Sequence, residues 1–375
     1  LDERFDDIYI DKILGLSLSP ELIKKHKDLK FVYTPIHGTG GQIIPRLFKK
    51  AGFNNIDCVE EQMIVDGNFP TVVSPNPEEK AALTMAIEKA KKVNADVVLA
   101  TDPDADRVGI AVKDNNGEFV LLNGNQTAAL LTYYILGRWN ELSKFSGKEY
   151  IVKTIVTTEL LIDIANKYNV KSFDVLTGFK FIADTILNNP EMTFVCGGEE
   201  SYGFLIGDFV RDKDANSACF MIAEIAAWAA EQNKSLYQIL KEIYKEFGFY
   251  KEGLISLTKK GISGTEEIKN MMRKFREEPP TEILGSRIVE IKDYKIGISK
   301  DIISGKETEI KLPKSDVLQF FTEDGTKISV RPSGTEPKIK FYFGIKAELN
   351  DIADFDTVND KLNNRLNELG KLFSE

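Results

Sequence analysis

The 375-residue sequence predicts two consecutive α/β domains with mixed sheets, followed by a small α+β domain at the C-terminal end. Three patterns support this prediction. Short apolar runs alternate with helical stripes up to about residue 148, and the same alternation restarts at Ile151. From about residue 285 a hairpin pattern replaces it. We therefore expect domains at 1–148, 149–260 and 285–375, with 261–284 as a connection.

The elements of the first domain follow from hydrophobic periodicity and from turn residues. We expect helices over 5–13, 42–51 and 76–93 and strands over 31–33, 96–100, 108–112 and 119–122. In the third helix, Asn76 is suited to the N-cap and Pro77 to the first helical position. A glycine-rich turn at 37–41 separates the first strand from its helix.

The same reasoning assigns elements to the rest of the chain. For the second domain we expect strands over 151–156 and 193–196 and helices over 159–168, 217–231 and 236–247. For the third we expect a hairpin of 317–321 and 328–330, a strand over 339–345 and a closing helix over 355–369.

Composition narrows the class of protein. Lys and Arg number 49 and Asp and Glu 58, a net charge of −9, which argues against a general nucleic-acid binder. No run of about 18 apolar residues is present, so we expect no membrane span. Cys58, Cys196 and Cys219 lack metal-site spacing and are expected to be free thiols in a reducing cytoplasm. A first residue other than Met suggests an excised or processed piece.

An acidic loop follows the predicted strand at 96–100. Asp102, Asp104 and Asp106 stand at every second position, so their side chains are expected on one side of the backbone. Like charges this close favour a hard divalent cation, although a solvated acidic turn is the plain alternative. An EF-hand is excluded, because its positions six and twelve would be Arg107 and Lys113. An aspartyl-phosphate nucleophile stays open.

A second polar turn lies between two predicted strands of the last domain. Arg331 offers forked donors, Ser333 and Thr335 offer hydroxyls, and Gly334 exposes backbone N–H groups. This combination is typical of a phosphate site. An ordinary polar hairpin turn is the alternative, since Ser and Gly are common turn formers.

Three weaker patterns occur elsewhere in the sequence. Two lie between the acidic loop and the turn at Arg331, and one precedes the acidic loop. Glu199 and Ser201 stand in a glycine-bounded loop that suits sugar hydroxyls, although a plain loop explains it equally well. Lys153 and Lys180 are candidate phosphate partners or proton donors, or else surface lysines. His37, in the turn at 37–41, precedes a predicted helix. The N-terminus of that helix suits an anion, and the alternative is that the turn simply leads into the helix.

Taken in order, these motifs resemble those of the α-D-phosphohexomutases, closest to the phosphoglucomutase branch that shares features with phosphopentomutases. The similar stretches are 34–41, 66–70, 100–112, 177–182, 198–214 and 331–337. They span most of the chain. The family enzyme has four domains, and the resemblance implies that this chain holds domains two, three and four.

The resemblance also implies roles for particular residues. Asp102, Asp104 and Asp106 would bind Mg²⁺, and Arg107 would face the transferring phosphate. The sugar and its phosphates would meet Glu199, Ser201, Lys153 and Lys180, with a less certain role for Arg211 and Lys213. The non-reacting phosphate would lie against Arg331, Ser333, Gly334 and Thr335.

One departure from the family is large. The family carries its phosphoryl group on a serine in a loop that contains histidine, and here neither His26 nor His37 follows a serine. We therefore expect the phosphoserine domain to be missing and the chain to be inactive alone. The expected activity of the parent enzyme is Mg²⁺-dependent conversion of hexose 1-phosphate, most simply glucose, to the 6-phosphate through a bisphosphate. A non-catalytic sugar-phosphate module, a phosphatase, and phosphomannomutase or phosphopentomutase specificity stay open.

Overall fold

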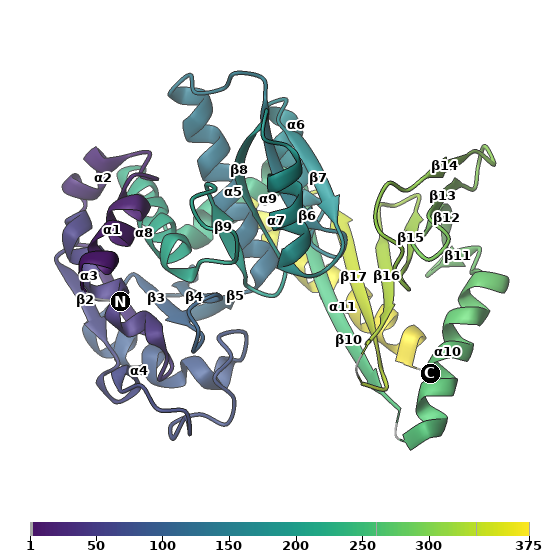
Figure 1. The fold of residues 1–375 in the computed structure, drawn as a ribbon, viewed down its shortest axis with the longest axis horizontal. Helices are drawn as coiled ribbons and strands as arrows, with labels where there is room; N and C mark the ends of the chain where they lie inside the picture. Colours follow the sequence, from purple (N-terminus) through teal and green to yellow (C-terminus); the bar gives the residue numbers. More distant parts are fainter. Residues whose placement is uncertain (1–2, 260, 335, 375) are drawn as a thin grey trace. The chain divides into compact units, whose positions relative to one another are not determined.

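The computed structural model describes residues 3–259, 261–334 and 336–374. The chain forms two compact units, Leu1–Ile243 and Tyr244–Glu375. The first unit contains two separate mixed sheets with helices, and the second contains one large sheet with two long helices (Figure 1). This architecture confirms the predicted fold class. Among the described residues, no helix has both the length and the apolar character needed to cross a membrane.

The first sheet of unit 1 has the strand order β2-β1-β3-β4-β5. Its strands are β1 (Lys30–Thr34), β2 (Asn55–Cys58), β3 (Val97–Thr101), β4 (Val108–Lys113) and β5 (Phe119–Leu122). The first three are parallel, whereas β4 runs antiparallel to both β3 and β5. Every residue of β3 is buried, as expected for a central strand covered on both faces. The carboxyl end of β3 therefore leads out of a rigid core.

Helices α1 (Glu3–Leu14), α2 (Pro20–Lys25), α3 (Ile44–Ala51) and α4 (Thr84–Val93) accompany this sheet. The helix predicted over 76–93 is wrong at its N-terminal end, because only a 3₁₀ turn at Lys80–Leu83 precedes α4. The side-chain oxygen of Asn76 accepts the N–H of Glu78 at 3.0 Å, and Glu79 is extended. Asn76 thus forms a turn rather than a helix cap. Pro77 instead packs on β4, where a Cβ at Gly109 would lie 2.5 Å from the Pro77 carbonyl oxygen.

The second sheet of unit 1 has the order β7-β6-β8-β9. Its strands are β6 (Glu149–Thr154), β7 (Lys171–Val175), β8 (Thr193–Gly198) and β9 (Phe204–Ile206), with only β9 antiparallel. Its helices are α5 (Gly124–Glu141), α6 (Leu160–Lys167), α7 (Phe179–Asn188), α8 (Ala215–Glu231) and α9 (Leu236–Phe247). Helix α8 is apolar almost all round and packs against α3, β3, α5 and β9, so it joins the two halves of the unit.

Unit 2 is built on an antiparallel sheet of order β10-β17-β16-β15-β12-β13-β14, with β11 paired to β12. Its strands are β10 (Phe249–Thr258), β11 (Glu282–Ile283), β12 (Ser286–Asp293), β13 (Ile298–Asp301), β14 (Glu307–Glu309), β15 (Leu318–Thr322), β16 (Lys327–Pro332) and β17 (Lys338–Ala347). The predicted hairpin is present as β15 and β16. The closing helix is α11 (Phe355–Ser374), which packs on β10 and β17.

The stretch 261–284, expected as a connection, contains helix α10 (Gly261–Glu277). Ile268 and Met272 are buried one turn apart, and Phe275 continues the same face. The ring of Phe275 lies 6.2 Å from that of Phe341 and 6.1 Å from that of Phe373 on α11. The helix therefore belongs to the core of unit 2. Charged residues surround these apolar positions, so the helical pattern was not recognised from the sequence.

Candidate functional site

The acidic loop connects β3 to β4 at the carboxyl end of β3. One carboxylate oxygen from each of Asp102, Asp104 and Asp106 lies within 4.8 Å of the other two. Ala105, between Asp104 and Asp106, has a positive φ of 57°, a conformation that is uncommon for a residue with a Cβ. Asp102 is buried, Asp106 is half-buried and Asp104 is exposed. The loop thus presents three converging carboxylates to one point near the surface.

Neighbouring segments hold this loop in place. The carboxylate of Asp102 accepts the backbone N–H groups of Asp106 at 3.0 Å and Arg107 at 2.8 Å. The N–H of Thr39 donates to the carbonyl of Pro103 at 2.9 Å. Only glycine fits beside this contact, because a Cβ at Gly38 would lie 2.4 Å from Pro103 Cα. The glycine-rich turn at 37–41 therefore supports the acidic loop.

The same turn places His37 in the interior. One ring nitrogen lies 2.8 Å from the carbonyl oxygen of Ile64, and the other lies 2.8 Å from the hydroxyl of Thr71. Both nitrogens are thus engaged by protein groups. In this structure His37 therefore stabilises the turn at 37–41 by linking it to Ile64 and Thr71.

Two cations face the acidic loop. Lys213 Nζ lies 2.6 Å from Asp106 Oδ2. Arg107 Nε lies 3.8 Å from Asp102 and 3.9 Å from Asp106, while its terminal nitrogen pairs with Glu78 at 3.1 Å. Glu78 was not identified as part of this site from the sequence, where it only follows an expected helix start. A cation–carboxylate network thus surrounds the cluster.

The acidic loop fits a hard divalent cation. Burial raises the pKa of Asp102 to about 7, and the charges of Asp106 and Asp104 add to this effect. Burial removes the water that stabilises the ionised form of Asp102, and a bound cation would stabilise that form instead. The oxygens around a six-coordinate Mg²⁺ lie about 3 to 4 Å apart. The three carboxylate oxygens of the loop lie within 4.8 Å of one another, which is close to that spacing. The donor set is all oxygen, as Mg²⁺ prefers.

Mg²⁺ affinity should depend on pH through Asp102. Because the pKa of Asp102 is raised to about 7, the carboxyl is largely neutral below that pH and must lose a proton to bind the ion. We expect the apparent affinity to fall about tenfold between pH 8 and pH 6. Calorimetry in two buffers of different ionisation enthalpy would also detect the released proton. Equal affinity at both pH values would contradict the prediction.

A second loop lies next to the acidic loop. The N–H of Val108, at the start of β4, donates to the carbonyl of Tyr202 at 3.0 Å. In this second loop, Glu199 Oε1 accepts the N–H of Gly178 at 2.8 Å, at the N-terminal end of α7. Lys213 contacts both loops, because its ammonium pairs with Asp106 at 2.6 Å and its stem passes Gly203 of the second loop, where a Cβ would lie 2.3 Å from Lys213 Cδ. The two loops and Lys213 therefore form one continuous site in unit 1.

Helix α7 adds an exposed cation to this region. Lys180 lies in its first turn and is exposed, with its ammonium 5.0 Å from the centre of the Phe181 ring. Ser201 is half-buried in the second loop. Arg211 is exposed and lies 3.9 Å from Asp208. All three are accessible to a ligand.

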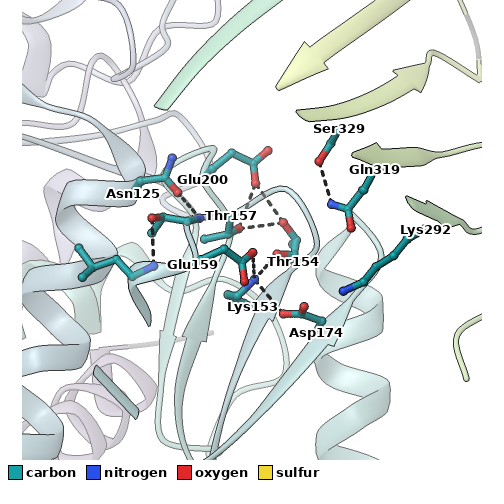
Figure 2. Close-up of polar contacts among 12 residues, drawn as sticks. Asn125, Lys153, Thr154, Thr157, Glu159, Asp174, Glu200, Lys292, Gln319 and Ser329 are labelled. Carbon is teal, nitrogen blue, oxygen red and sulfur yellow. Dashed lines mark hydrogen bonds and ion pairs between the residues drawn. The ribbon is translucent and has the colours of Figure 1, made fainter. Parts of the chain in front are cut away.

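Glu200, which was not identified as a site residue from the sequence, connects the second loop to the end of β6 and the residues that follow it. Its carboxylate accepts hydrogen bonds from Thr154 at 3.1 Å and Thr157 at 3.2 Å (Figure 2). Burial raises the pKa of Glu200. Glu199 and Glu200 thus have different partners, because Glu199 bonds to the backbone at the start of α7 and Glu200 to two threonine hydroxyls.

Lys153 is fully buried at the end of β6. Its ammonium pairs with Asp174 at 2.8 Å and Glu159 at 3.0 Å (Figure 2). Burial disfavours the charged ammonium, but the two carboxylates outweigh it and raise the pKa of Lys153 well above its ordinary value. The contacts of Lys153 are therefore internal to the protein, unlike those of Lys180.

The predicted phosphate turn lies in unit 2, between β16 and β17. Arg331 and Ser333 are half-buried and Gly334 is exposed, while Thr335 lies outside the described residues. The N–H of Ser333 donates to the carbonyl of Lys338 at 2.7 Å, and the N–H of Glu336 donates to the Ser333 hydroxyl at 3.3 Å. The turn is therefore closed by its own backbone. Arg331 is aligned with Lys340 on β17, so two cations stand side by side.

Comparison with known proteins identifies the chain's relatives. Residues 7–117, 123–247 and 289–355 match domains II, III and IV of the phosphoglucomutase/phosphomannomutase family, described as two alpha/beta/alpha domains and a C-terminal domain. The chain belongs to this family. A phosphoglucomutase of Staphylococcus aureus strain MRSA252 is 40% identical over 337 residues, covering 90% of this chain and 59% of the relative. The chain therefore spans less than two thirds of that relative's length.

Solved structures show the same fold. A phosphoglucomutase/phosphomannomutase family protein from Burkholderia thailandensis superimposes with a TM-score of 0.61 at 20% identity, over 96% of this chain and 64% of that one. The N-acetylphosphoglucosamine mutase of Aspergillus fumigatus gives 0.52 at 14% identity, over 96% and 69%. That structure contains GlcNAc-6P and magnesium.

Within this phosphoglucomutase/phosphomannomutase chain, unit 1 brings six of the fourteen predicted site residues together. The residues that share the acidic-loop region are Asp102, Asp104, Asp106, Arg107, Glu199 and Lys213. The turn at Arg331 is in unit 2 and is described by itself. The pairing of Lys213 with Asp106 joins residues 107 positions apart, and no local pattern in the sequence signals it.

Proposed function

We propose that this chain is part of a Mg²⁺-dependent mutase that converts hexose 1-phosphate to hexose 6-phosphate, most simply for glucose, through a bisphosphate. The convergence of Asp102, Asp104 and Asp106, with Arg107 and Lys213 against them, carries the proposal. Phosphoryl transfer depends on positioning and charge stabilisation, and this arrangement supplies both. The Staphylococcus aureus relative is named a phosphoglucomutase, which supports the choice of sugar.

The site residues divide by chemistry. The three aspartates would hold Mg²⁺, which when bound neutralises charge on the transferring phosphoryl group. Arg107 and Lys213 would bind the oxygens of that group. Glu199 keeps one carboxylate oxygen beyond its bond to Gly178, and that oxygen can accept sugar hydroxyls.

Other residues are proposed to bind the ends of the substrate. Ser201, Lys180 and Arg211 are accessible for the sugar and its phosphates. The turn at Arg331, Ser333, Gly334 and Thr335 is proposed to hold the phosphate that does not react. The Aspergillus fumigatus relative binds a sugar 6-phosphate with magnesium, which supports this class of ligand. Lys153 has no such access, and we propose that it supports β6 instead.

Turnover is proposed to require a phosphoserine domain in addition to this chain. A serine phosphate would pass its phosphoryl group to a sugar hydroxyl: the new P–O bond would form as the serine P–O bond breaks, and the hydroxyl proton would replace the phosphoryl group on the serine oxygen. The other phosphate of the resulting bisphosphate would then return to the serine. A cytoplasmic location follows from the proposed sugar-phosphate substrate.

An assay with glucose 1-phosphate and Mg²⁺ tests the function. The 375-residue chain is expected to bind the sugar phosphate without turnover, and the polypeptide that includes a phosphoserine domain is expected to form glucose 6-phosphate without releasing inorganic phosphate. Released phosphate would indicate a phosphatase. Binding without turnover in both would indicate a non-catalytic module. Mannose and ribose 1-phosphates assayed in parallel would establish specificity.

Arg331→Ala is expected to reduce glucose 6-phosphate affinity about tenfold to a hundredfold, because a charged, forked hydrogen bond is lost. Arg331→Lys should recover only part of the loss, since a single ammonium cannot form two parallel bonds. Calorimetric titration measures the affinity, and melting curves of each variant serve as the control. If Arg331→Ala lowered the melting temperature without changing affinity, the turn would be structural.

A further inference from the structure

Arg107 is the cation that the acidic loop itself carries. Its backbone is fixed by Asp102 on both sides. The N–H of Arg107 donates to the Asp102 carboxylate at 2.8 Å, and the N–H of Asp102 donates to the Arg107 carbonyl at 3.3 Å. The side chain of Arg107 is 37% exposed, so burial does not hold its long stem in one direction. The direction of the guanidinium therefore depends on the groups that it contacts.

Glu78 makes the shortest of these contacts. Nη1 of Arg107 donates to Glu78 Oε1 at 3.1 Å. Nε of the same side chain lies 3.8 Å from Asp102 and 3.9 Å from Asp106, distances too long for a hydrogen bond. Nη2 forms no hydrogen bond with any residue that the structure describes. The planar guanidinium is thus oriented through Nη1, and Nη2 is left to donate to an anion.

The turn that carries Glu78 is fixed as well. The side-chain oxygen of Asn76 accepts the N–H of Glu78 at 3.0 Å, and the carbonyl of Asn76 accepts the N–H of Glu79 at 3.0 Å. Pro77 is buried against β4, where a Cβ at Gly109 would lie 2.5 Å from the Pro77 carbonyl oxygen. Gly109 stands two positions after the arginine of the acidic loop. Docking of the turn on β4 therefore brings the Glu78 carboxylate to that guanidinium.

We propose that Glu78 is a positioning residue of the mutase, which directs the Arg107 guanidinium toward the transferring phosphoryl group. This inference rests on the proposed function, in which Arg107 binds oxygens of that group. Direction matters because the donors of a guanidinium lie in one plane and reach phosphate oxygens only within that plane. The charge of Glu78 by itself repels an anion, so its electrostatic effect is opposite in sign to its positioning effect.

Binding of glucose 1-phosphate to the 375-residue chain, measured by calorimetry in the presence of Mg²⁺, tests the role of Glu78. We expect Glu78→Ala to weaken binding about tenfold, because the guanidinium loses the hydrogen bond that orients it. Glu78→Gln should stay within about threefold of the wild type, since its amide oxygen can still accept from Nη1. Glu79→Ala is the matched control, because it removes the same charge from an exposed neighbour and should leave the affinity unchanged.

A double-mutant cycle connects the effect to this pair of residues. In an Arg107→Ala background, Glu78→Ala should cause no further loss of affinity. Equal losses in both backgrounds would show that Glu78 does not act through Arg107, and would overturn the inference. The two side chains are 37% and 32% exposed, so the pair contributes little to stability and the melting temperatures should match that of the wild type. A lowered melting temperature with unchanged affinity would indicate a structural role alone.

The outcomes also separate this inference from the proposed function. If Arg107→Ala weakened glucose 1-phosphate binding while Glu78→Ala left it unchanged or tightened it, the positioning role would be wrong and the proposed function would stand. If Arg107→Ala bound as tightly as the wild type, or if the wild type did not bind, the proposed role of Arg107 and the positioning role of Glu78 would both be wrong.

Discussion

Replacing Asp102, Asp104 and Asp106 together by asparagine is expected to abolish Mg²⁺ binding, a loss of at least about a hundredfold in affinity. Mg²⁺ binds charged oxygens in preference to amide oxygens, and the change removes all three carboxylates from the cluster. The loop itself should survive, because asparagine at position 102 can still accept the N–H groups of Asp106 and Arg107 through its side-chain oxygen. Calorimetry of the wild type and the triple variant measures the loss.

The same triple variant should bind Mg²⁺ less tightly but be more stable than the wild type when no metal is present. Burial raises the pKa of Asp102 to about 7, so its ionised form destabilises the metal-free fold above that pH. Between the unfolded pKa and about 7 the folded state binds the extra proton, and stability falls as pH rises through this window. At pH 8 and without Mg²⁺ the triple variant should be more stable by about 1–2 kcal/mol. Glu118→Gln, at an exposed site, is the control. Unchanged Mg²⁺ binding in the triple variant would show that the ion binds elsewhere.

Lys153→Met is expected to destabilise unit 1 by about 2–4 kcal/mol, the second large effect. The variant leaves Asp174 and Glu159 without the ammonium that both contact, at 2.8 and 3.0 Å. The two carboxylates are about one third exposed, so water recovers part of the lost interaction and the effect should be less than for a fully buried pair. Urea unfolding at pH 7 measures the change. The pKa of Lys153 is raised, so its stabilisation persists throughout neutral pH and is lost only at strongly alkaline pH.

Lys180→Met is the matched control, because Lys180 is an exposed lysine on α7. Its stability should stay within about 0.5 kcal/mol of the wild type. Adding Asp174→Asn to Lys153→Met should restore part of the lost stability by removing one unpaired charge. If Lys153→Met instead left the unfolding curve unchanged and lowered sugar-phosphate affinity, Lys153 would belong to the binding site.

Local patterns in the sequence were sufficient for much of the fold. The apolar run of β3, and the turn residues at 114–117 between the apolar runs of β4 and β5, indicate a buried strand followed by a hairpin, and the structure has both. The acidic loop could be singled out because three carboxylates stand at alternate positions after a buried strand, and the structure brings one oxygen of each within 4.8 Å of the other two. The helix predicted over 76–93 was wrong only over 76–83, because an asparagine followed by a proline starts a turn as readily as a helix.

The sequence by itself determined which residues could carry charge, where the chain must turn, and which segments must be buried, because these depend on residue type and short-range spacing. Only the tertiary structure decided how those charges are used. Lys153 and Lys180 are alike in the sequence, yet one is sealed between two carboxylates and the other faces solvent. Lys213 meets Asp106 because α8 and the acidic loop pack together, with the N–H of Ala215 bonded to Ala105 at 3.1 Å. Such pairs depend on long-range packing, and the free energy that fixes them is distributed over the whole core.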